Sequence, residues 1–278
     1  MTTEKQDFWS AEAYQDAAAF VPRLAGKIVG WLDVQKDDVI LDIGCGDGVL
    51  DVSIGHILAQ GHGSVHGIDS SLAMITSAET AVRTAGLSNC TFEVLDANDL
   101  PHRPDLLQAR FHKAFSNAAL HWILRPPDRR EAFFRGVRDA LQPGGLFAFE
   151  MGGLGNVAEL VTAVVAAVSR RVGLAATVVA DPWFFPDEAW ARHMLESRVG
   201  GWSVLAAERQ WRPTPAGTSG VDGWIRLMAR PFLDLIPDPI EREACTREIV
   251  QVLEYTTRQP DGSFNLNYVR LRVLARKI

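Results

Sequence analysis

Short apolar runs alternate with longer stretches of mixed polarity through the first 150 residues of the chain. The short runs are rich in Val, Ile, Leu and Phe, and several end at Gly or Asp, which is typical of buried parallel strands. The longer stretches carry apolar residues at helical spacing between capping Ser and terminating Gly residues. We predict strands at 39–43, 64–68, 91–95, 113–115 and 146–150, helices at 10–34, 47–60, 70–85 and 128–141, and a turn at 142–145. This alternation predicts an α/β fold, with a parallel sheet between two layers of helices.

The pattern is less regular after residue 150. We predict helical structure over 153–180, a helix near 187–199, a strand at 202–210, helices at about 219–230 and 239–257, and a closing strand at 264–274. An aromatic loop, residues 181–186, interrupts this part. We therefore divide the chain into an N-terminal helical segment (1–34), an α/β core (35–152), and a region (153–278) that completes the sheet and adds helices as a cap over the strand ends.

Composition narrows the possible partners and compartment. The chain has 278 residues, of which 47% are hydrophobic and 22% charged, and its net charge of −6 argues against a nucleic-acid partner. Its 3 cysteines, at wide spacing, form no disulfide framework, which favours a reducing compartment. The N-terminus is polar, and the most apolar run, 157–168, is shorter than the ~20 residues of a membrane span. We expect a cytoplasmic monomer or homodimer without a membrane partner.

A glycine-rich turn between the first strand and the next helix carries the clearest chemical signal. Residues 42–48 read DIGCGDG, so three glycines alternate and an acid stands two positions before the first. Glycines at this spacing allow a tight turn and a close approach to a ligand. A dinucleotide fingerprint needs a third glycine where this chain has Val49, which disfavours a dehydrogenase. A carboxylate at position 42 would repel a pyrophosphate but attract an amino group or a sulfonium.

Two further acids end the next two strands. Asp69 ends the second strand, where an acid in nucleotide-binding folds accepts hydrogen bonds from ribose hydroxyls. Asp96 ends the third strand and could accept a hydrogen bond from an adenine amine. Because the carboxyl ends of parallel strands meet at one edge of the sheet, these acids and Asp42 are expected to face one crevice.

These motifs together resemble those of class I S-adenosylmethionine-dependent methyltransferases over about residues 38–150. The resemblance implies a Rossmann-like, doubly wound sheet of seven strands with the last strand antiparallel, and S-adenosyl-L-methionine as the cofactor. It places the methionyl part at the glycine turn, the ribose at Asp69 and the adenine at Asp96, with Met74 packed against the adenine ring. The implied cofactor-binding residues are Tyr14, Asp42, Gly44, Cys45, Gly46, Asp69, Ser70, Met74, Asp96, Ala97 and Asn117.

A closer resemblance, to the trans-aconitate methyltransferase branch, extends over most of the chain. It rests on Trp9 and Tyr14, on residues 115–122 (FSNAALHW) and 141–145 (LQPGG), on Trp224 followed by Arg230-Pro231, and on residues 273–276 (VLAR). The chain departs from this branch at residues 17–22 (AAAFVP), where the branch carries charged residues. The departure weakens the case for a tricarboxylate acceptor, and Phe20 favours a more apolar one.

Methyl transfer mainly requires alignment and a site with little water. A carboxylate acceptor needs no base, whereas a hydroxyl, amine or thiol usually benefits from one. His121 is the candidate base, although it could equally be a structural residue beside Trp122, and Asn117 could orient the acceptor. Candidate acceptor-binding residues are Trp9, Phe20, Trp122, Trp183 and Arg230. We expect no metal site, because Gly63 and a strand separate His62 from His66 and no third ligand is evident.

The sequence thus predicts methylation of a small molecule, with a carboxylic acid that becomes a methyl ester as the leading acceptor. The alternatives are methylation of a hydroxyl, thiol or carbon of a natural product, as in secondary metabolism. A cofactor-sensing or scaffold protein with a degenerate site is the non-enzymatic alternative. Residues 1–22 are expected to close over the cofactor as a lid, with Tyr14 lying across it.

Overall fold

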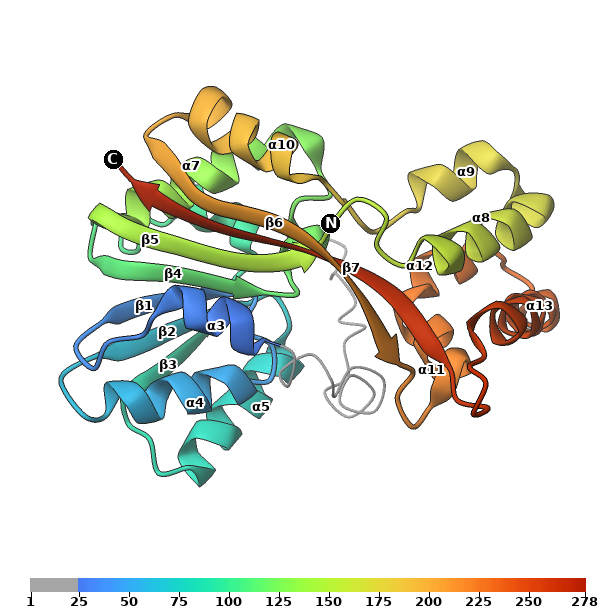
Figure 1. The fold of residues 1–278 in the computed structure, drawn as a ribbon, viewed down its shortest axis with the longest axis horizontal. Coiled ribbons are helices and arrows are strands. Elements are labelled where there is room, and N and C mark those ends of the chain that lie inside the picture. The colour runs from blue at the N-terminus through green and yellow to red at the C-terminus, as the bar shows by residue number, and fades with distance from the viewer. Residues whose placement is uncertain (1–24) are drawn as a thin grey trace, which may run out of the picture.

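The computed structural model describes residues 25–278, which form one mixed sheet flanked by helices (Figure 1). The strand order is β3-β2-β1-β4-β5-β7-β6. The strands are β1 (Val39–Ile43), β2 (Ser64–Asp69), β3 (Cys90–Val94), β4 (Phe111–Asn117), β5 (Leu141–Gly152), β6 (Trp202–Pro215) and β7 (Asn265–Lys277). The α-helices are α3 (Gly26–Leu32), α4 (Val49–Leu58), α5 (Leu72–Thr84), α6 (Leu120–Ile123), α7 (Arg130–Ala140), α8 (Ala158–Val172), α9 (Leu174–Val179), α10 (Glu188–Arg192), α11 (Gly220–Met228), α12 (Arg230–Leu233) and α13 (Pro239–Thr257). Short helices of other types are η1 (Ala97–His102), η2 (Pro127–Arg129) and the π-helical η3 (His193–Val199).

Parallel pairing brings the ends of the first four strands together. In the register, Asp42 of β1 lies between Gly67 of β2 and Phe115 of β4. β3 continues the parallel sheet on one side and β5 on the other. The loops after β1 to β4 therefore open at one edge of the sheet, as the sequence predicts.

The last strand reverses direction. β7 is antiparallel to both β5 and β6, so the predicted sheet of seven strands with an antiparallel last strand is confirmed. Beyond the end of β5, β6 and β7 continue as a two-stranded ribbon that reaches the second group of helices (Figure 1).

Three apolar clusters fill the structure. One lies between the sheet and α7 with η3, and includes Phe133, Phe147 and Phe149. A second lies between the sheet and α3 with α4, and includes Ile28 and Phe115. The third is separate and joins α8, α11, α12 and α13 with the outer end of β7. This third group, which we call the helical cap, lies beyond the carboxyl ends of the parallel strands (Figure 1).

Several predicted boundaries need correction. The helical stretch predicted over 153–180 is two helices, because Gly173 between them adopts a φ of +88°. The helix predicted near 187–199 starts as α10 and continues as a π-helix. The turn predicted at 142–145 lies inside β5, where Gly144 has a φ of +79° and the pairing with β4 changes register. Of the helix predicted over 10–34, only the part from residue 25 onward is described.

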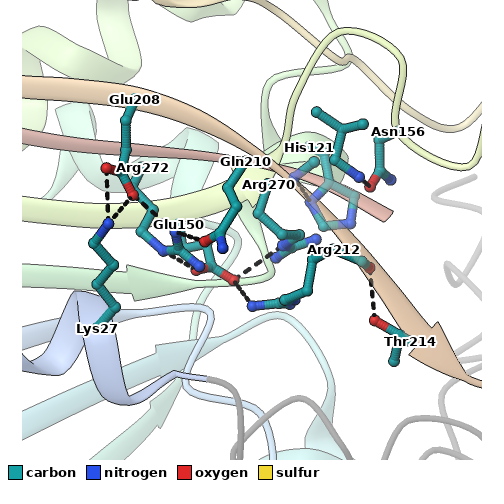
Figure 2. Close-up of polar contacts among 12 residues, drawn as sticks. Lys27, His121, Glu150, Asn156, Glu208, Gln210, Arg212, Thr214, Arg270 and Arg272 are labelled. Atoms are coloured by element: carbon teal, nitrogen blue, oxygen red, sulfur yellow. Dashed lines mark hydrogen bonds and ion pairs between the residues drawn. The ribbon is translucent and has the colours of Figure 1, made fainter. Parts of the chain in front are cut away.

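The antiparallel half of the sheet contains a buried ion network (Figure 2). The Glu150 carboxylate accepts hydrogen bonds from Arg270 Nε at 3.0 Å, from Arg212 Nη1 at 3.2 Å and from Arg272 Nε. Glu150 is 1% exposed, Arg270 3% and Arg272 2%. Burial alone would raise the pKa of Glu150, but the three guanidinium groups outweigh it and hold that pKa below its usual value. Glu150 is therefore ionised and neutralises part of a larger positive charge.

We predict that Glu150→Ala lowers the free energy of unfolding by about 3–5 kcal/mol, because it leaves buried guanidinium groups without their carboxylate. Urea unfolding at pH 7 measures the change. Glu243→Ala is the matched control, since Glu243 pairs with Arg226 on an exposed surface and its removal should leave the midpoint unchanged within error. Equal midpoints for the two variants would contradict a structural role for the network.

Candidate functional site

A cleft that is open to solvent lies at the carboxyl ends of the parallel strands. Among its lining residues, those that the sequence predicts are Gly44, Gly46, Asp69, Ser70, Met74, Asp96, Ala97, Asn117 and Trp122. The lining residues that the sequence did not single out are Leu95, Ala118, Ala119 and Ile123. The structure thus brings most of the predicted cofactor residues to one place.

The glycine turn forms one wall of the cleft. Gly44 has a φ of +75°, and a Cβ at this position would lie 2.3 Å from Ala119 Cβ. Only glycine therefore allows the turn to approach the start of α6 this closely. Gly46 also has a positive φ, +58°, but a Cβ there would meet no described atom within 4 Å. The backbone at Gly46 therefore borders open space that a larger residue would fill.

Asp69 joins the end of β2 to the glycine turn. Its Oδ2 accepts a hydrogen bond from the Gly46 amide at 3.1 Å, and its Oδ1 accepts one from the Ser71 amide at 2.9 Å. Asp96 caps η1, since its Oδ1 accepts from the Asn98 amide at 3.0 Å. Backbone amides thus fix the orientation of both carboxylates at the cleft.

Asp42 and Cys45 belong to the same turn segment but do not line the cleft. Asp42 is 2% exposed and faces Asp51, a residue of α4 that is 0% exposed and that sequence reasoning missed. Burial raises the pKa of Asp42 well above its usual value, and the neighbouring Asp51 raises it further. Burial also raises the pKa of Asp51, to about 7. The sequence does contain a signal for Asp51, because this acid stands on the apolar face of α4, in line with Ile54 and Leu58.

Asn117 and His121 follow β4 at the other wall. The Asn117 Oδ1 is buried without a hydrogen-bond partner among residues 25–278. His121 is 8% exposed, and its Nδ1 accepts a hydrogen bond from the Gly152 amide at 3.4 Å, so the neutral ring carries its proton on Nε2. Burial, and then the charge of Arg270, hold the pKa of His121 well below its usual value.

Two predicted acceptor residues lie away from the lining of the cleft. Trp183 is 9% exposed and packs in an aromatic cluster with Trp122 and Phe185 at centroid distances of 5.6 and 5.8 Å. Arg230, at the start of α12, is 45% exposed and pairs with Asp234 at 3.4 Å. Trp9, Tyr14, Phe20 and the predicted lid lie outside the described residues.

A cationic group near His121 is the second feature that sequence reasoning missed. Arg270 of β7 pairs in register with Gly152, whose amide contacts His121, and Figure 2 shows Arg270 and Arg212 on the same side as the His121 ring. Among the described residues, nothing accepts a hydrogen bond from Arg270 Nη1 or Nη2, although the residue is 3% exposed. The sequence signal for this cationic group is the alternation of two arginines, 270 and 272, with apolar residues in a buried strand.

No group of three or more His, Cys, Asp or Glu within residues 25–278 is arranged to hold a metal ion. In the same part of the chain, every helix is too short or too polar to cross a lipid bilayer.

The fold, with its glycine turn and acidic strand ends at one cleft, is that of Rossmann-like methyltransferases. Residues 40–145 match a methyltransferase domain family. An uncharacterized methyltransferase of Schizosaccharomyces pombe is 36% identical over 279 aligned positions, which cover 98% of this chain and 99% of that protein. The chain therefore belongs to the class I S-adenosylmethionine-dependent methyltransferases.

Two other similarities are weaker. A trans-aconitate 2-methyltransferase of Escherichia fergusonii is 29% identical over 143 positions, which cover 51% of this chain and 50% of that protein. The crystal structure of the YcgJ protein from Bacillus superposes with a TM-score of 0.60 at 16% identity, over 91% of this chain and 97% of that one. The first leaves the branch within the family open, and the second concerns the fold alone.

Proposed function

We propose that the protein transfers a methyl group from S-adenosylmethionine to a small carboxylic acid and forms a methyl ester. The observation that carries this proposal is the pair of buried donors beyond the cleft, the Nε2–H of His121 and the unaccepted Nη groups of Arg270. Two donors of this kind, one of them cationic, suit a carboxylate. The partial similarity to a trans-aconitate 2-methyltransferase also supports an acidic acceptor.

The residues at the cleft fit the cofactor. The open space at Gly46 accommodates a ligand against the backbone, and the carboxylates of Asp69 and Asp96 are held at the cleft with lone pairs suited to hydroxyl and amine donors. In our proposal Gly44 and Gly46 hold the methionyl part, Asp69 binds the ribose, and Asp96 with Ala97 binds the adenine beside Met74. When bound, the cofactor supplies a methyl group activated by its sulfonium sulfur.

His121 acts as a donor rather than a base in this proposal. A base needs a free lone pair and a pKa near the working pH. The Gly152 amide occupies Nδ1, and burial keeps the ring neutral with its proton on Nε2. A carboxylate acceptor requires no proton to leave, so Nε2–H can hold one carboxylate oxygen while the other attacks. A hydroxyl or thiol acceptor, the alternative, needs a base that this arrangement does not supply.

We predict that Asp69→Ala weakens binding of S-adenosylmethionine by roughly 10–100-fold, because charge-assisted hydrogen bonds are worth about 1.5–3 kcal/mol each. Isothermal titration calorimetry with the cofactor and its demethylated product measures this. Asp99→Ala, an exposed acid on η1 that does not line the cleft, is the control and should bind like the parent. Unchanged affinity in the Asp69 variant would remove the ribose assignment.

We predict that Arg270→Gln raises the KM for carboxylic acid acceptors by roughly 10–100-fold with a smaller change in kcat, because it removes binding common to the ground and transition states. A panel of mono- and dicarboxylic acids, with ester formation followed by mass spectrometry, identifies the acceptors. Arg270→Lys keeps the charge and should retain part of the affinity. It also keeps the prediction testable if Arg270→Gln fails to fold. Arg226→Gln, on an exposed part of α11, is the control. An unchanged KM in both Arg270 variants would argue against an anionic acceptor.

We predict that His121→Ala lowers turnover by less than about tenfold if the product is an ester, since no proton has to be removed. Loss of a general base would instead cost about 10²–10⁴-fold. Single-turnover rates at saturating acceptor measure the effect. A loss in the larger range, together with ether or thioether formation, would favour the hydroxyl or thiol alternative.

A further inference from the structure

A side-chain amide connects two of the segments that line the cleft. Asn98 stands in η1, directly after Asp96 and Ala97. Its Nδ2 donates a hydrogen bond to Asp96 Oδ1 at 3.2 Å and another to the backbone carbonyl of Ile123, the last residue of α6, at 3.1 Å. Asp96, Ala97 and Ile123 line the cleft, whereas Asn98 does not. Asn98 can therefore act on a bound ligand only through the residues that it holds.

The neighbours of the Asn98 side chain determine which way its amide points. A carboxylate oxygen and a backbone carbonyl both accept hydrogen bonds, so only the NH₂ group can lie between them. The Asn98 Oδ1 is buried and has no hydrogen-bond partner among residues 25–278. A buried acceptor without a partner weakens a fold, so this side chain contributes through its donor. An oxygen in the place of Nδ2 would be repelled by both neighbours.

Asn98 fixes the carboxylate of Asp96 in two ways. Its backbone amide donates to Asp96 Oδ1 at 3.0 Å, and its side chain donates to the same oxygen. The second hydrogen bond of Nδ2 then ties this carboxylate to Ile123. Carbonyl groups in the last turn of a helix have no partner within the helix, so Ile123 offers an acceptor at a defined place. The Asp96 carboxylate is thereby held relative to η1 and to α6, which follow different strands of the sheet.

We propose that Asn98 is a positioning residue that orients Asp96 toward the 6-amino group of the adenine, and thereby contributes to a preference of the cleft for adenine over a 6-oxopurine. The proposal rests on the function proposed above, which assigns Asp96 and Ala97 to the adenine. A carboxylate accepts a hydrogen bond from an amine but repels a keto oxygen, and a site built for a donor rejects an analogue that lacks it. The preference depends on orientation, because hydrogen bonds weaken steeply as their angle departs from linearity.

Competition titrations of the full chain with two ligands test the proposal. One ligand is the demethylated product, S-adenosylhomocysteine, and the other is S-inosylhomocysteine, in which a 6-oxo group replaces the 6-amino group. Asn98→Asp keeps the shape of the side chain but places an oxygen between the two acceptors, and titration at pH 8.5 keeps the added carboxyl ionised. Asn98→Ala removes the donor without adding repulsion.

Asn89→Ala is the matched control. The Asn89 Nδ2 also donates to a backbone carbonyl, that of Gly55 at 3.0 Å, but Asn89 does not line the cleft and holds no residue that does. Both ligands are measured on every variant, so a partial loss of folded protein affects the two alike and leaves the ratio of their Kd values unchanged.

We expect the parent and Asn89→Ala to bind S-adenosylhomocysteine at least about 100-fold more tightly than S-inosylhomocysteine. This ratio should fall about 3–10-fold in Asn98→Ala and more than about tenfold in Asn98→Asp, through weaker binding of the adenine ligand. A role in packing alone predicts the opposite order, because Asp fills the same volume as Asn.

An unchanged ratio in both Asn98 variants, or a larger loss in Asn98→Ala than in Asn98→Asp, would overturn the inference while leaving the proposed function intact. Equal affinity of the parent for the two ligands would remove the assignment of Asp96 to the adenine, and the inference with it. Failure of the parent to bind S-adenosylhomocysteine at all would instead reject the function on which the inference rests.

Discussion

The parallel pairing of β1 between β2 and β4 is the constraint on which the rest of the site depends. It places the end of β1 at the centre of the sheet, where the following turn can touch both neighbouring strand ends. The Gly44 amide donates to the Ile68 carbonyl of β2 at 2.8 Å, and the same residue packs against Ala119 after β4. One residue without a side chain thus connects three strands, and the position of Asp69 relative to the turn follows from that connection.

The antiparallel half of the sheet has to accommodate charged side chains of β7 that are buried. β7 runs from the helical cap into the sheet between β5 and β6, and it carries charged residues through a buried layer. Glu150 makes this possible by accepting from three arginines, while Glu208 and Gln210 of β6 accept from Arg272 at 2.9 and 2.7 Å. Because Glu208 also pairs with Lys27 of α3, the network ties the start of the described chain to its last strand. The same network leaves Arg270 beside His121, so one side chain belongs both to the structural network and to the proposed acceptor site.

The parts that could be predicted from the sequence are those with local signals. Alternating strands and helices, the glycine turn and the acids at strand ends each lie within a few consecutive residues, and the structure brings Gly46, Asp69 and Asp96 to one cleft. Glu150 and Arg270 are 120 positions apart and meet only through the pairing of β5 with β7, which no local pattern reveals. Arg230, a cation that the sequence makes a candidate, pairs with a neighbour one helical turn away on the surface, and its role in acceptor binding stays a prediction.

The separate core of the helical cap has a consequence for how such an enzyme diversifies. The apolar cluster of the cap shares with the sheet only the outer part of β7, including Leu266 and Tyr268, within the described chain. Trp122, which lines the cofactor cleft, packs against this same cluster and lies 5.6 Å from Trp183, centroid to centroid. A substitution in the cap that displaces Trp183 therefore reaches the wall of the cleft. Divergence of the cap core is thus coupled to the cofactor cleft through these aromatic side chains.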